Sequence, residues 1–421
     1  MNILVVGRGG REHAILWALK RSDKVKQLYC APGNAGTALI AENVDIGEFE
    51  FDRLVQFSQD SGIDLVVIGP DDPLAAGIVD AFEAARIPVY GPRKNAAEIE
   101  GSKIFMKNLL RKYDIPTAKY ETFTDYAAAR DYLQSQPVPI VIKADGLAAG
   151  KGVTVCFTRE EAEKALEETM VSRSFGAAGD KVVIEEFLEG QEMSILAFVD
   201  GETVRPMSPA QDHKPAYDGD KGPNTGGMGT YSPLPHIDQS IIDDAIENII
   251  KPTACAMVSE GRPFRGVLFA GLMITKDGPK TIEFNARFGD PETQVVLPRL
   301  QTDLLDIFLA SINGRLNEID ITWSEEAAVC VVLASGGYPG SYAKGLPITG
   351  LEEVSEEQAL VFHAGTASKD DQIVTNGGRV LGIVGRGVGI AEARANAYAA
   401  ANRISFEGKM NRTDIAAKAL I

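Results

Sequence analysis

Short apolar runs alternate with helical patterns through the first 100 residues, and this alternation restricts the fold more than any other feature of the sequence. Asn2–Val6 and Asp64–Ile68 have the composition of buried strands. Each ends at a glycine and is followed by a helical pattern, Glu12–Lys20 after the first and Leu74–Ala85 after the second. Strands that alternate with helices in this way predict a parallel α/β sheet.

The chain is too long for this sheet to be its only domain. With 421 residues it exceeds what one hydrophobic core usually supports. Strand patterns flank a glycine-rich loop at 146–152, and an apolar strand at 328–333 starts a further pattern near the C-terminus. We therefore expect an N-terminal α/β domain at residues 1–101, a middle domain at 102–325 and a small C-terminal α+β domain at 326–421.

The composition disfavours several classes of protein. The net charge of −17 argues against nucleic acid or an anionic membrane as the main partner, because those partners favour a basic surface. No apolar run reaches the roughly 18 residues of a membrane-spanning helix. The 4 cysteines are far apart and form no CxxC motif, so we expect neither a zinc site nor a disulfide framework. A reducing cytoplasm fits this cysteine usage.

The segment Gly7-Arg8-Gly9-Gly10-Arg11-Glu12 follows a strand and opens a helix, where a phosphate-binding loop would stand. It begins like a dinucleotide fingerprint, but Glu12 holds the third glycine position, and no acidic residue ends a second strand about 20 residues later. NAD is therefore disfavoured. Two interpretations remain, a tight turn with close helix packing and a phosphate site at the helix N-terminus. A second small-residue loop at 32–37 would close the same pocket.

A second glycine-rich segment runs from Lys143 to Gly152 between two predicted strands. It resembles a P-loop only superficially, because its glycine spacing is one residue short and Gly152 occupies the position of the magnesium-binding hydroxyl. A glycine loop between two strands suits a lid over nucleotide phosphates, since backbone N–H groups can approach the oxygens without intervening side chains.

Glu283 and Asn285 belong to the densest polar stretch of the chain. They are two residues apart on a predicted strand, so both should face one side, with Ile282 and Phe284 on the other. Magnesium takes one or two protein oxygens and completes its shell with phosphates and water, so the pair is a candidate magnesium site. An amphipathic strand with a solvated face explains the same pattern. Arg287, next on that face, would hold an anionic oxygen.

Two further segments are candidates for function. Residues 185–192 end a strand in an acidic turn, whose backbone groups would hydrogen-bond an adenine edge while Glu192 accepts from ribose; a plain acidic turn is the alternative. Pro206–Pro235 is rich in glycine and proline and lacks periodicity. A segment this long without regular structure inside a domain is usually functional or mobile.

Together these motifs resemble the ATP-grasp superfamily. Lys103 before the sheet, Lys143 before the glycine lid, the turn at 185–192 and the Glu283-x-Asn285 pair occur in the order typical of its members. Other stretches resemble the glycinamide ribonucleotide synthetase family in particular, and the likeness covers essentially the whole chain. These stretches are Gly7–His13, Pro32–Thr37, Pro209–Lys214, Gly222–Gly229, Arg287–Glu292 and Ala334–Gly340.

The resemblance implies an ATP-dependent carbon–nitrogen ligase of purine biosynthesis. The middle domain would be a two-lobed ATP-grasp domain with a lid lobe at about 120–190, preceded by a pre-ATP-grasp domain. Members of the family join glycine to 5-phosphoribosylamine through glycyl phosphate and convert ATP to ADP and phosphate, with Mg²⁺ or Mn²⁺ as the metal. The implied partners are small molecules, and we expect a cytoplasmic monomer.

The resemblance also implies a role for each matching residue. Glu283 and Asn285 would bind the metal. The ATP-binding residues would be Lys103, Lys143, Gly150, Lys151, Gly152, Glu185, Glu186, Phe187, Leu188, Glu192 and Asn224. The catalytic residues, which would also hold glycine and the sugar amine, would be Arg287, Asp212 and Lys214. The other substrate-binding residues would be Gly9, Gly10, Arg11, Asn34, Gly36, Thr37 and Asp71.

Asp71 is the one visible departure from the family pattern, which has a glutamate at this position. The carboxylate belongs to an expected substrate loop, so a slightly altered pocket is expected. Two other functions stay open from the sequence. A related ATP-grasp carboxylase would use bicarbonate or formate, and a nucleotide-sensing protein would bind ATP without turnover. Release of ADP that requires glycine and phosphoribosylamine would distinguish the ligase from both.

Overall fold

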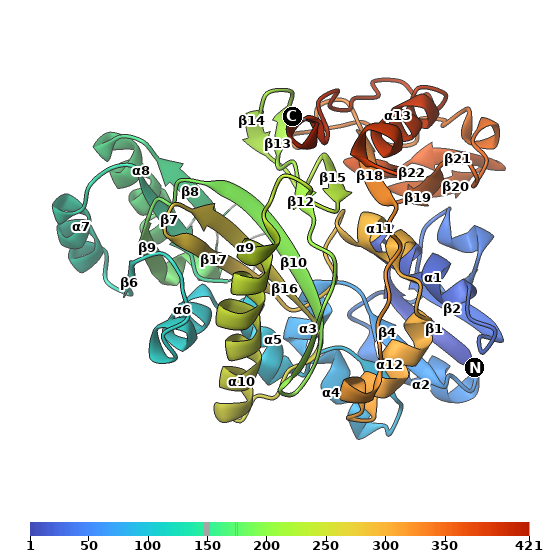
Figure 1. Ribbon diagram of the computed structural model, residues 1–421, viewed down its shortest axis with the longest axis horizontal. Coiled ribbons are helices and arrows are strands. Elements are labelled where there is room, and N and C mark those ends of the chain that lie inside the picture. The colour runs from blue at the N-terminus through green and yellow to red at the C-terminus, as the bar shows by residue number, and fades with distance from the viewer. Residues whose placement is uncertain (147–151, 173, 175, 421) are drawn as a thin grey trace.

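The first 101 residues form the predicted parallel α/β sheet with its helices (Figure 1). The structure, a computed structural model, describes residues 1–146, 152–172, 174 and 176–420. The strand order is β3-β2-β1-β4-β5, and all neighbours are parallel. The strands are β1 Asn2–Gly7, β2 Gln27–Pro32, β3 Glu42–Asn43, β4 Leu65–Ile68 and β5 Val89–Tyr90. The helices are α1 Gly10–Lys20, α2 Phe51–Asp60, α3 Asp71–Ala76, α4 Ile78–Ala84 and α5 Lys94–Gly101.

The predicted helix 74–85 is divided at Gly77 into α3 and α4. Gly77 has a φ of 99°, a conformation that glycine adopts without the steric cost of a Cβ atom. Helix α3 begins at Asp71, shortly after the carboxyl end of β4, and α1 begins shortly after the carboxyl end of the neighbouring strand β1. Arg11 and Asp71 therefore lie at the same edge of the parallel sheet.

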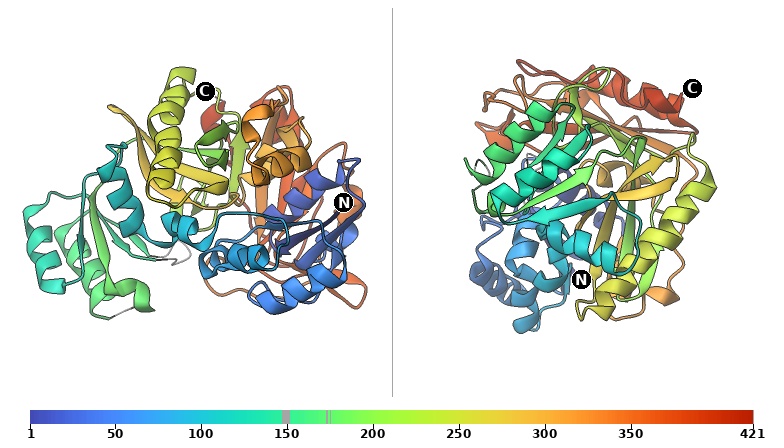
Figure 2. Two further views of the ribbon diagram at one scale, coloured as in Figure 1. Left: turned by 90° about the horizontal axis from the view of Figure 1, so that it is seen from below. Right: turned by 90° about the vertical axis from the view of Figure 1, so that its left-hand side faces the viewer.

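A small lobe projects to one side of the molecule, as Figure 2 shows. Its antiparallel sheet has the order β6-β9-β7-β8 and its own apolar core, which includes Leu133, Leu166 and Ile184. Helix α6, Lys103–Lys112, with Ser102 as its N-cap, leads into this lobe. The lobe contains β6 Tyr120–Phe123, α7 Tyr126–Ser135, β7 Ile140–Ala144, β8 Val153–Cys156, α8 Arg159–Met170 and β9 Val182–Glu186.

A second antiparallel sheet, of order β11-β10-β16-β17, forms the centre of the molecule. The strands are β10 Gln191–Asp200, β11 Thr203–Pro206, β16 Arg265–Thr275 and β17 Gly278–Asn285. A turn at Asp277-Gly278 joins β16 to β17. A continuous helical segment consists of α9 Gln239–Ala245, a π-helical turn Ile246–Ile250 and α10 Lys251–Ser259.

The segment Pro206–Pro235 corrects one expectation, because it contains four short strands. These are β12 Gln211–Asp212, β13 Pro215–Tyr217, β14 Lys221–Asn224 and β15 Gly229–Ser232. Strands of two to four residues are too short to show periodicity in the sequence. β13 pairs with β14 in a hairpin, whereas β12 and β15 join a sheet that continues into the C-terminal part of the chain.

That C-terminal sheet, of order β12-β15-β18-β22-β19, crosses the boundary expected near residue 326. Its C-terminal strands are β18 Ala327–Ala334, β19 Leu360–His363 and β22 Arg379–Gly387. Helix α13, Ile390–Ala401, packs on β22 and β18, and β20 Thr366–Lys369 pairs with β21 Gln372–Thr375. Helices α11 Thr293–Val296 and α12 Leu304–Ile312 lie between the central sheet and β18 along the chain. None of the described helices has both the length and the apolar character needed to span a membrane.

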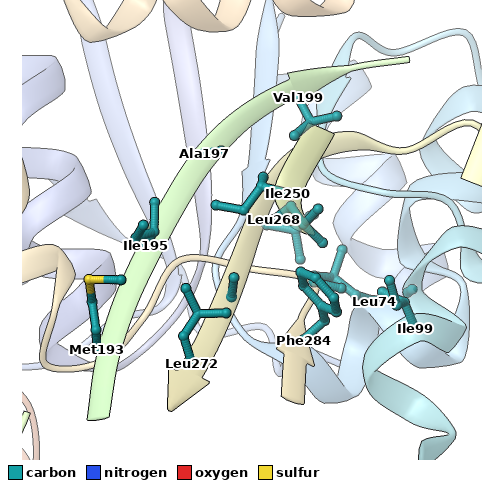
Figure 3. Close-up of a cluster of buried hydrophobic side chains, with 14 of the residues drawn as sticks. Leu74, Ile99, Met193, Ile195, Ala197, Val199, Ile250, Leu268, Leu272 and Phe284 are labelled. Atoms are coloured by element: carbon teal, nitrogen blue, oxygen red, sulfur yellow. The ribbon is translucent and has the colours of Figure 1, made fainter. Parts of the chain in front are cut away.

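The central sheet packs one face on a core that includes residues of the N-terminal helices. Figure 3 shows Leu268 and Leu272 of β16 and Phe284 of β17 beside Leu74 of α3 and Ile99 of α5. Phe284, which is 2% exposed, thus anchors the strand that carries Glu283 and Asn285 in this core.

We expect Leu268→Ala to destabilise the protein strongly. Leu268 is fully buried in this shared core, and such substitutions cost about 2–5 kcal/mol because they remove buried methyl groups and leave a cavity. The free energy of unfolding, measured by chemical denaturation, gives the result. Val388→Ala is the control, because Val388 is 88% exposed, and it should have little effect. A similar small loss for both variants would contradict the assigned core.

Candidate active site

A cavity of about 520 Å³ lies where the small lobe, the central sheet, the N-terminal domain and the C-terminal part meet. Most of the site residues expected from the sequence line it. They are Arg11, Asp71, Lys103, Lys143, Gly152, Glu185, Glu186, Phe187, Leu188, Glu192, Asp212, Lys214, Asn224, Glu283, Asn285 and Arg287. The fold therefore brings together residues that are up to about 276 positions apart in the chain, from Arg11 to Arg287.

Glu185 forms the most buried ionic contact of the cavity. One of its carboxylate oxygens forms an ion pair with Lys107 and the other with Lys143, and the three side chains are at most 5% exposed. Burial alone would raise the pKa of Glu185, but the two ammonium groups lower it below the ordinary glutamate range. Glu185 is expected to hold adenine mainly through its backbone; its side chain instead fixes Lys143. Lys107 is missing from the predicted site, although it lies one helical turn after Lys103.

Lys103 lies beside the glycine-rich segment. Its Nζ donates to the carbonyl oxygen of Gly146 at 2.8 Å, and burial lowers its pKa. At the other end of the segment, Gly152 is buried, lines the cavity and accepts a hydrogen bond from Ala144 N. Gly150 and Lys151 lie outside the described residues, so the lid remains a prediction.

Glu283 and Asn285 both face the cavity from the end of β17. Ile282 and Phe284, which were expected on the opposite face, also line it, so the alternation is not strict. Gly271 pairs with Glu283 and Leu272 with Thr281, so Ile282 is an extra residue in β17, and such a bulge redirects the side chains around it.

The donor set at the end of β17 fits a divalent cation. Burial alone would raise the pKa of Glu283, but Lys214, Lys143 and Lys103 lower it, so the carboxylate is ionised. Within the described ranges no cation forms an ion pair with Glu283. The side-chain oxygen of Asn285 accepts a hydrogen bond from Arg287 Nη2 at 3.2 Å and retains a second lone pair.

The residues expected around adenine and ribose lie at and after the end of β9 in the small lobe, except Glu192, which is in β10 of the central sheet. Glu186 accepts a hydrogen bond from Lys119 N at 3.0 Å, and the ring of Phe187 lies 5.9 Å from that of Phe157. Leu188 and Glu192 follow along the cavity wall, and the Glu192 carboxylate lies 3.6 Å from Lys214 Nζ.

A carboxylate-rich wall lies around Lys214. Burial raises the pKa of Glu292, which is 4% exposed, and the charge of Asp212 raises it further. Burial also raises the pKa of Asp212, although Lys214 opposes this effect. Glu292 is missing from the predicted site, although it ends the Arg287–Glu292 stretch on which the family resemblance depends.

The N-terminal domain contributes a wall of alternating charges. Arg11 pairs with Glu12 at 2.6 Å and donates to the carbonyl oxygen of Phe288 at 3.1 Å. Arg287 lies 3.3 Å from the carboxylate of Glu100, a buried residue that sequence reasoning missed. Burial would raise the pKa of Asp71, but Arg287 and Arg11 lower it, so the aspartate is ionised in this wall.

The predicted phosphate loops do not line the cavity, apart from Arg11. Asn34 donates to the carbonyl oxygens of Arg8 and His363 and accepts from the N–H groups of Gly36 and Thr37. Gly36 lies so close to the ring of His363 that a Cβ atom would stand 2.3 Å from it. These contacts explain why the residues of the loop are small, because the N-terminal domain packs closely against β19 at this point. Contacts of Gly9, Gly10, Asn34, Gly36 and Thr37 with a sugar phosphate remain predictions.

Among the described residues of the C-terminal part, Arg379 at the start of β22 is the one that lines the cavity. Arg379 donates to the carbonyl oxygens of Gly226 and Asp290 at 2.6 and 2.7 Å and lies 3.3 Å from the carboxylate of Asp290. No local motif marks it, because its partners are 89 or more residues away in the chain.

We expect Glu292→Gln to stabilise the metal-free, nucleotide-free protein increasingly as pH rises. The raised pKa means that folded Glu292 binds a proton above about pH 4.3, where an unfolded glutamate has lost it. Stability is therefore lost as pH rises towards the raised pKa, and glutamine abolishes this loss. The melting-temperature difference between variant and wild type should grow from about pH 4.5 to about pH 8.

The exposed residue Glu318, whose pKa is lowered by Arg315, provides the control. Its glutamine variant should not gain stability relative to wild type over the same range. A difference for Glu292→Gln that is constant with pH would contradict the burial of an ionisable carboxyl at this position.

Three family models match the chain in succession. The N domain of phosphoribosylglycinamide synthetase matches residues 1–100, its ATP-grasp (A) domain residues 101–293, and its C domain residues 328–418. Among curated proteins, the phosphoribosylamine–glycine ligase of Halalkalibacterium halodurans is 52% identical over 420 residues, 100% of this chain and 97% of that protein. The ligase of the same name from Vibrio cholerae is 49% identical over 423 residues, with 100% and 99% covered.

A comparison with solved structures finds the same family. The crystal structure of phosphoribosylamine–glycine ligase from Thermotoga maritima has a TM-score of 0.87 and 36% identity, with 99% of this chain and 100% of that chain covered. The biotin carboxylase domain of 2-oxoglutarate carboxylase from Hydrogenobacter thermophilus, solved with MgADP, has a TM-score of 0.72 at 15% identity over 97% and 91% of the two chains. At that identity it shows the shared fold alone.

Proposed function

The chain belongs to the phosphoribosylglycinamide synthetase family, and we propose that the cavity described above is the place where it joins glycine to 5-phosphoribosylamine. The activity is that of an ATP-dependent carbon–nitrogen ligase of purine biosynthesis. The ATP-grasp family implies ATP as a substrate and a divalent metal, which we propose to be Mg²⁺ with Mn²⁺ as a substitute. A cytoplasmic location, a monomeric state and the lack of a nucleic-acid partner remain predictions from the sequence.

The proposal rests on how the charged side chains are distributed around the cavity. Lys103 and Lys143 lie towards the small lobe, whereas Asp212 and Glu292 surround Lys214 on another wall. Glu283 is under the electrostatic influence of all three lysines, so it lies between the two regions. An anionic nucleotide and an ammonium-bearing amino acid would thus each find the opposite charge.

We propose that Lys103 and Lys143 neutralise ATP phosphates, and that Glu283 and Asn285 hold the metal. A bound divalent cation neutralises phosphate oxygens during phosphoryl transfer. Glu186, Phe187, Leu188 and Glu192 would surround adenine and ribose, together with the backbone of Glu185, and Asn224 would face the nucleotide. Asp71 would contact the phosphoribosyl group beside Arg11.

The reaction then proceeds in two steps. A carboxylate oxygen of glycine attacks the γ-phosphorus of ATP, and the bond to the β-γ bridging oxygen breaks, which gives glycyl phosphate and ADP. The amine nitrogen of phosphoribosylamine attacks the acyl carbon, phosphate leaves with the bonding electrons, and the nitrogen loses a proton. Asp212 and Glu292 would bind the ammonium group of glycine. Arg287 and Lys214 would bind the oxygens that bear negative charge. Positioning and charge neutralisation provide the rate enhancement, since no side-chain nucleophile is required.

A substrate-dependence assay tests the proposed function. The purified full-length protein is incubated with MgATP, and ADP release is measured with glycine, with phosphoribosylamine, with both, and with bicarbonate. ADP should form when both substrates are present, bicarbonate should have no effect, and the product should have the mass of glycinamide ribonucleotide. ADP release that depends on bicarbonate, or ATP binding without turnover under every condition, would overturn the proposal.

We expect Glu283→Gln to lower turnover by roughly a hundredfold or more, because metal neutralisation of phosphate charge contributes several kcal/mol to the transition state. Glutamine has nearly the same shape, so the variant should still fold, with some loss of melting temperature because the lysines around Glu283 lose a favourable charge partner. The control is Glu325→Gln, at an exposed position outside the cavity, which should retain wild-type turnover. Near-normal activity of Glu283→Gln at ordinary magnesium concentration would remove Glu283 from the metal site.

A further inference from the structure

The hairpin of β13 and β14 reaches the cavity only at its base. Lys214 precedes β13 and Asn224 ends β14, and both line the cavity. The rest of the hairpin has very little core, since Ala216 is the single buried residue of the two strands. An isolated two-stranded hairpin is marginally stable in water. Its conformation must therefore be fixed by other contacts.

The C-terminal tail, residues 411–418, provides these contacts. The guanidinium of Arg412, in a side chain only 1% exposed, donates to the carbonyl oxygen of Pro215 at 3.1 Å and to Asp220 at 3.0 Å. The same guanidinium forms a two-bond fork with Asp414, at 2.7 Å for each bond, and Asp414 in turn accepts from Gly219 N at 2.8 Å. Both the base and the tip of the hairpin are thus attached to one buried cation.

Further contacts attach the tip of the hairpin to the tail. Asp218 accepts from the backbone N–H and the hydroxyl of Thr413, and Asp220 accepts from Lys418 Nζ at 2.6 Å. Burial alone would raise the pKa of Asp220, but its hydrogen bonds to Lys418 and Arg412 lower it. The tail therefore binds both aspartates of the turn.

The tail is itself held by α13 and β15. Tyr398 OH donates to the carbonyl oxygen of Arg412 at 2.9 Å, and Arg394 donates to the carbonyl oxygens of Ile415 and Thr413. The side chain of Ile415 is fully buried and lies against Gly229. A rigid helix thus anchors the tail, and the tail anchors the hairpin.

We propose that Arg412 is a positioning residue for the ligase reaction, because it fixes the hairpin whose base presents Lys214 and Asn224 to the substrates. This inference rests on the proposed function. Arg412 lines no part of the cavity, so it acts through the hairpin. The carbonyl oxygen of Lys214 supports the same geometry by accepting from the N–H and hydroxyl of Thr225 at 2.8 and 2.7 Å.

The test compares Arg412→Gln with Arg412→Lys in the full-length protein. Misplaced binding groups lower catalytic efficiency, and we expect kcat/KM for glycine and phosphoribosylamine to fall on the order of tenfold to a hundredfold in Arg412→Gln. The KM for at least one of these two substrates should rise. Arg412→Lys should lie between wild type and Arg412→Gln, because lysine keeps the charge but cannot make the planar fork.

Arg394→Gln is the matched control. It removes an arginine that binds the same tail, but Arg394 has no described contact with the hairpin. It should lower the melting temperature and change both KM values less than Arg412→Gln does, because Tyr398 and the buried Ile415 still hold the tail in place. Asp220→Asn is a second test variant, because Asp220 is 40% exposed and its loss should not prevent folding. It should change the same KM values in the same direction as Arg412→Gln, by a smaller factor.

The proposal is overturned if Asp220→Asn and a folded Arg412→Gln keep both KM values within about a factor of two of wild type. It is also overturned if Arg394→Gln changes KM as strongly as Arg412→Gln does. Wild-type ADP release that requires glycine and phosphoribosylamine establishes the activity in the same assay. Failure of the positioning role is therefore distinguishable from failure of the proposed function.

Discussion

The ion pairs of Glu185 with Lys107 and Lys143 join three elements at a point where solvent has almost no access. Lys107 comes from α6, Lys143 from β7 and Glu185 from β9. Loss of one partner from a buried ion pair costs about 3–5 kcal/mol, yet apolar side chains of similar size often stabilise a fold as well or better. Stability alone therefore does not explain the triad. Its physical consequence is geometric, because it holds the ammonium group of Lys143 at one position in the cavity.

The rest of the cavity depends on that fixed cation. Lys143, Lys103 and Lys214 keep Glu283 ionised despite its burial, which a metal ligand requires. On another wall, Asp212 and Glu292 have raised pKa values, because too little positive charge compensates for burial and for neighbouring carboxylates. The ligand-free protein thus has an excess of cations on one side and of carboxylates on the other. A bound nucleotide, metal and ammonium group would together neutralise both excesses of charge. Substrate binding would therefore also compensate the unbalanced charge of the cavity.

Sequence reasoning recovered the parts of this site that lie within single motifs. Glu283 and Asn285 are two positions apart on one strand, and the parallel sheet of the N-terminal domain follows from strand–helix alternation, so both are local patterns. The bulge at Ile282 was missed, because it depends on how β17 pairs with β16. Glu100 and Arg379 were missed for a related reason, since their partners are Arg287 and Asp290, far along the chain.

The same limit applies to the loop at 32–37, whose small residues were interpreted as a phosphate site. A loop that packs against His363 needs small residues as much as a loop that binds a ligand does, and the sequence does not distinguish the two requirements. The segment Pro206–Pro235 shows the reverse case. Its short strands have no period of their own, and β15 acquires its conformation by pairing with β18, a strand nearly 100 residues later.

This pairing explains why the C-terminal part contributes to the cavity. Because β12 and β15 are strands of the C-terminal sheet, the chain between them, which includes Lys214 and Asn224, leaves and returns to that sheet. The position of those residues therefore depends on β18, β22 and α13 as well as on the central sheet, which carries Glu283 and Asn285 and contacts Lys214 through Glu192 of β10. Arg379 reaches the cavity from β22 and binds Gly226, just beyond the hairpin. The C-terminal part thus fixes one wall of the cavity while the central sheet fixes another, and under the proposed function their relative position would decide how substrates bound on the two walls meet.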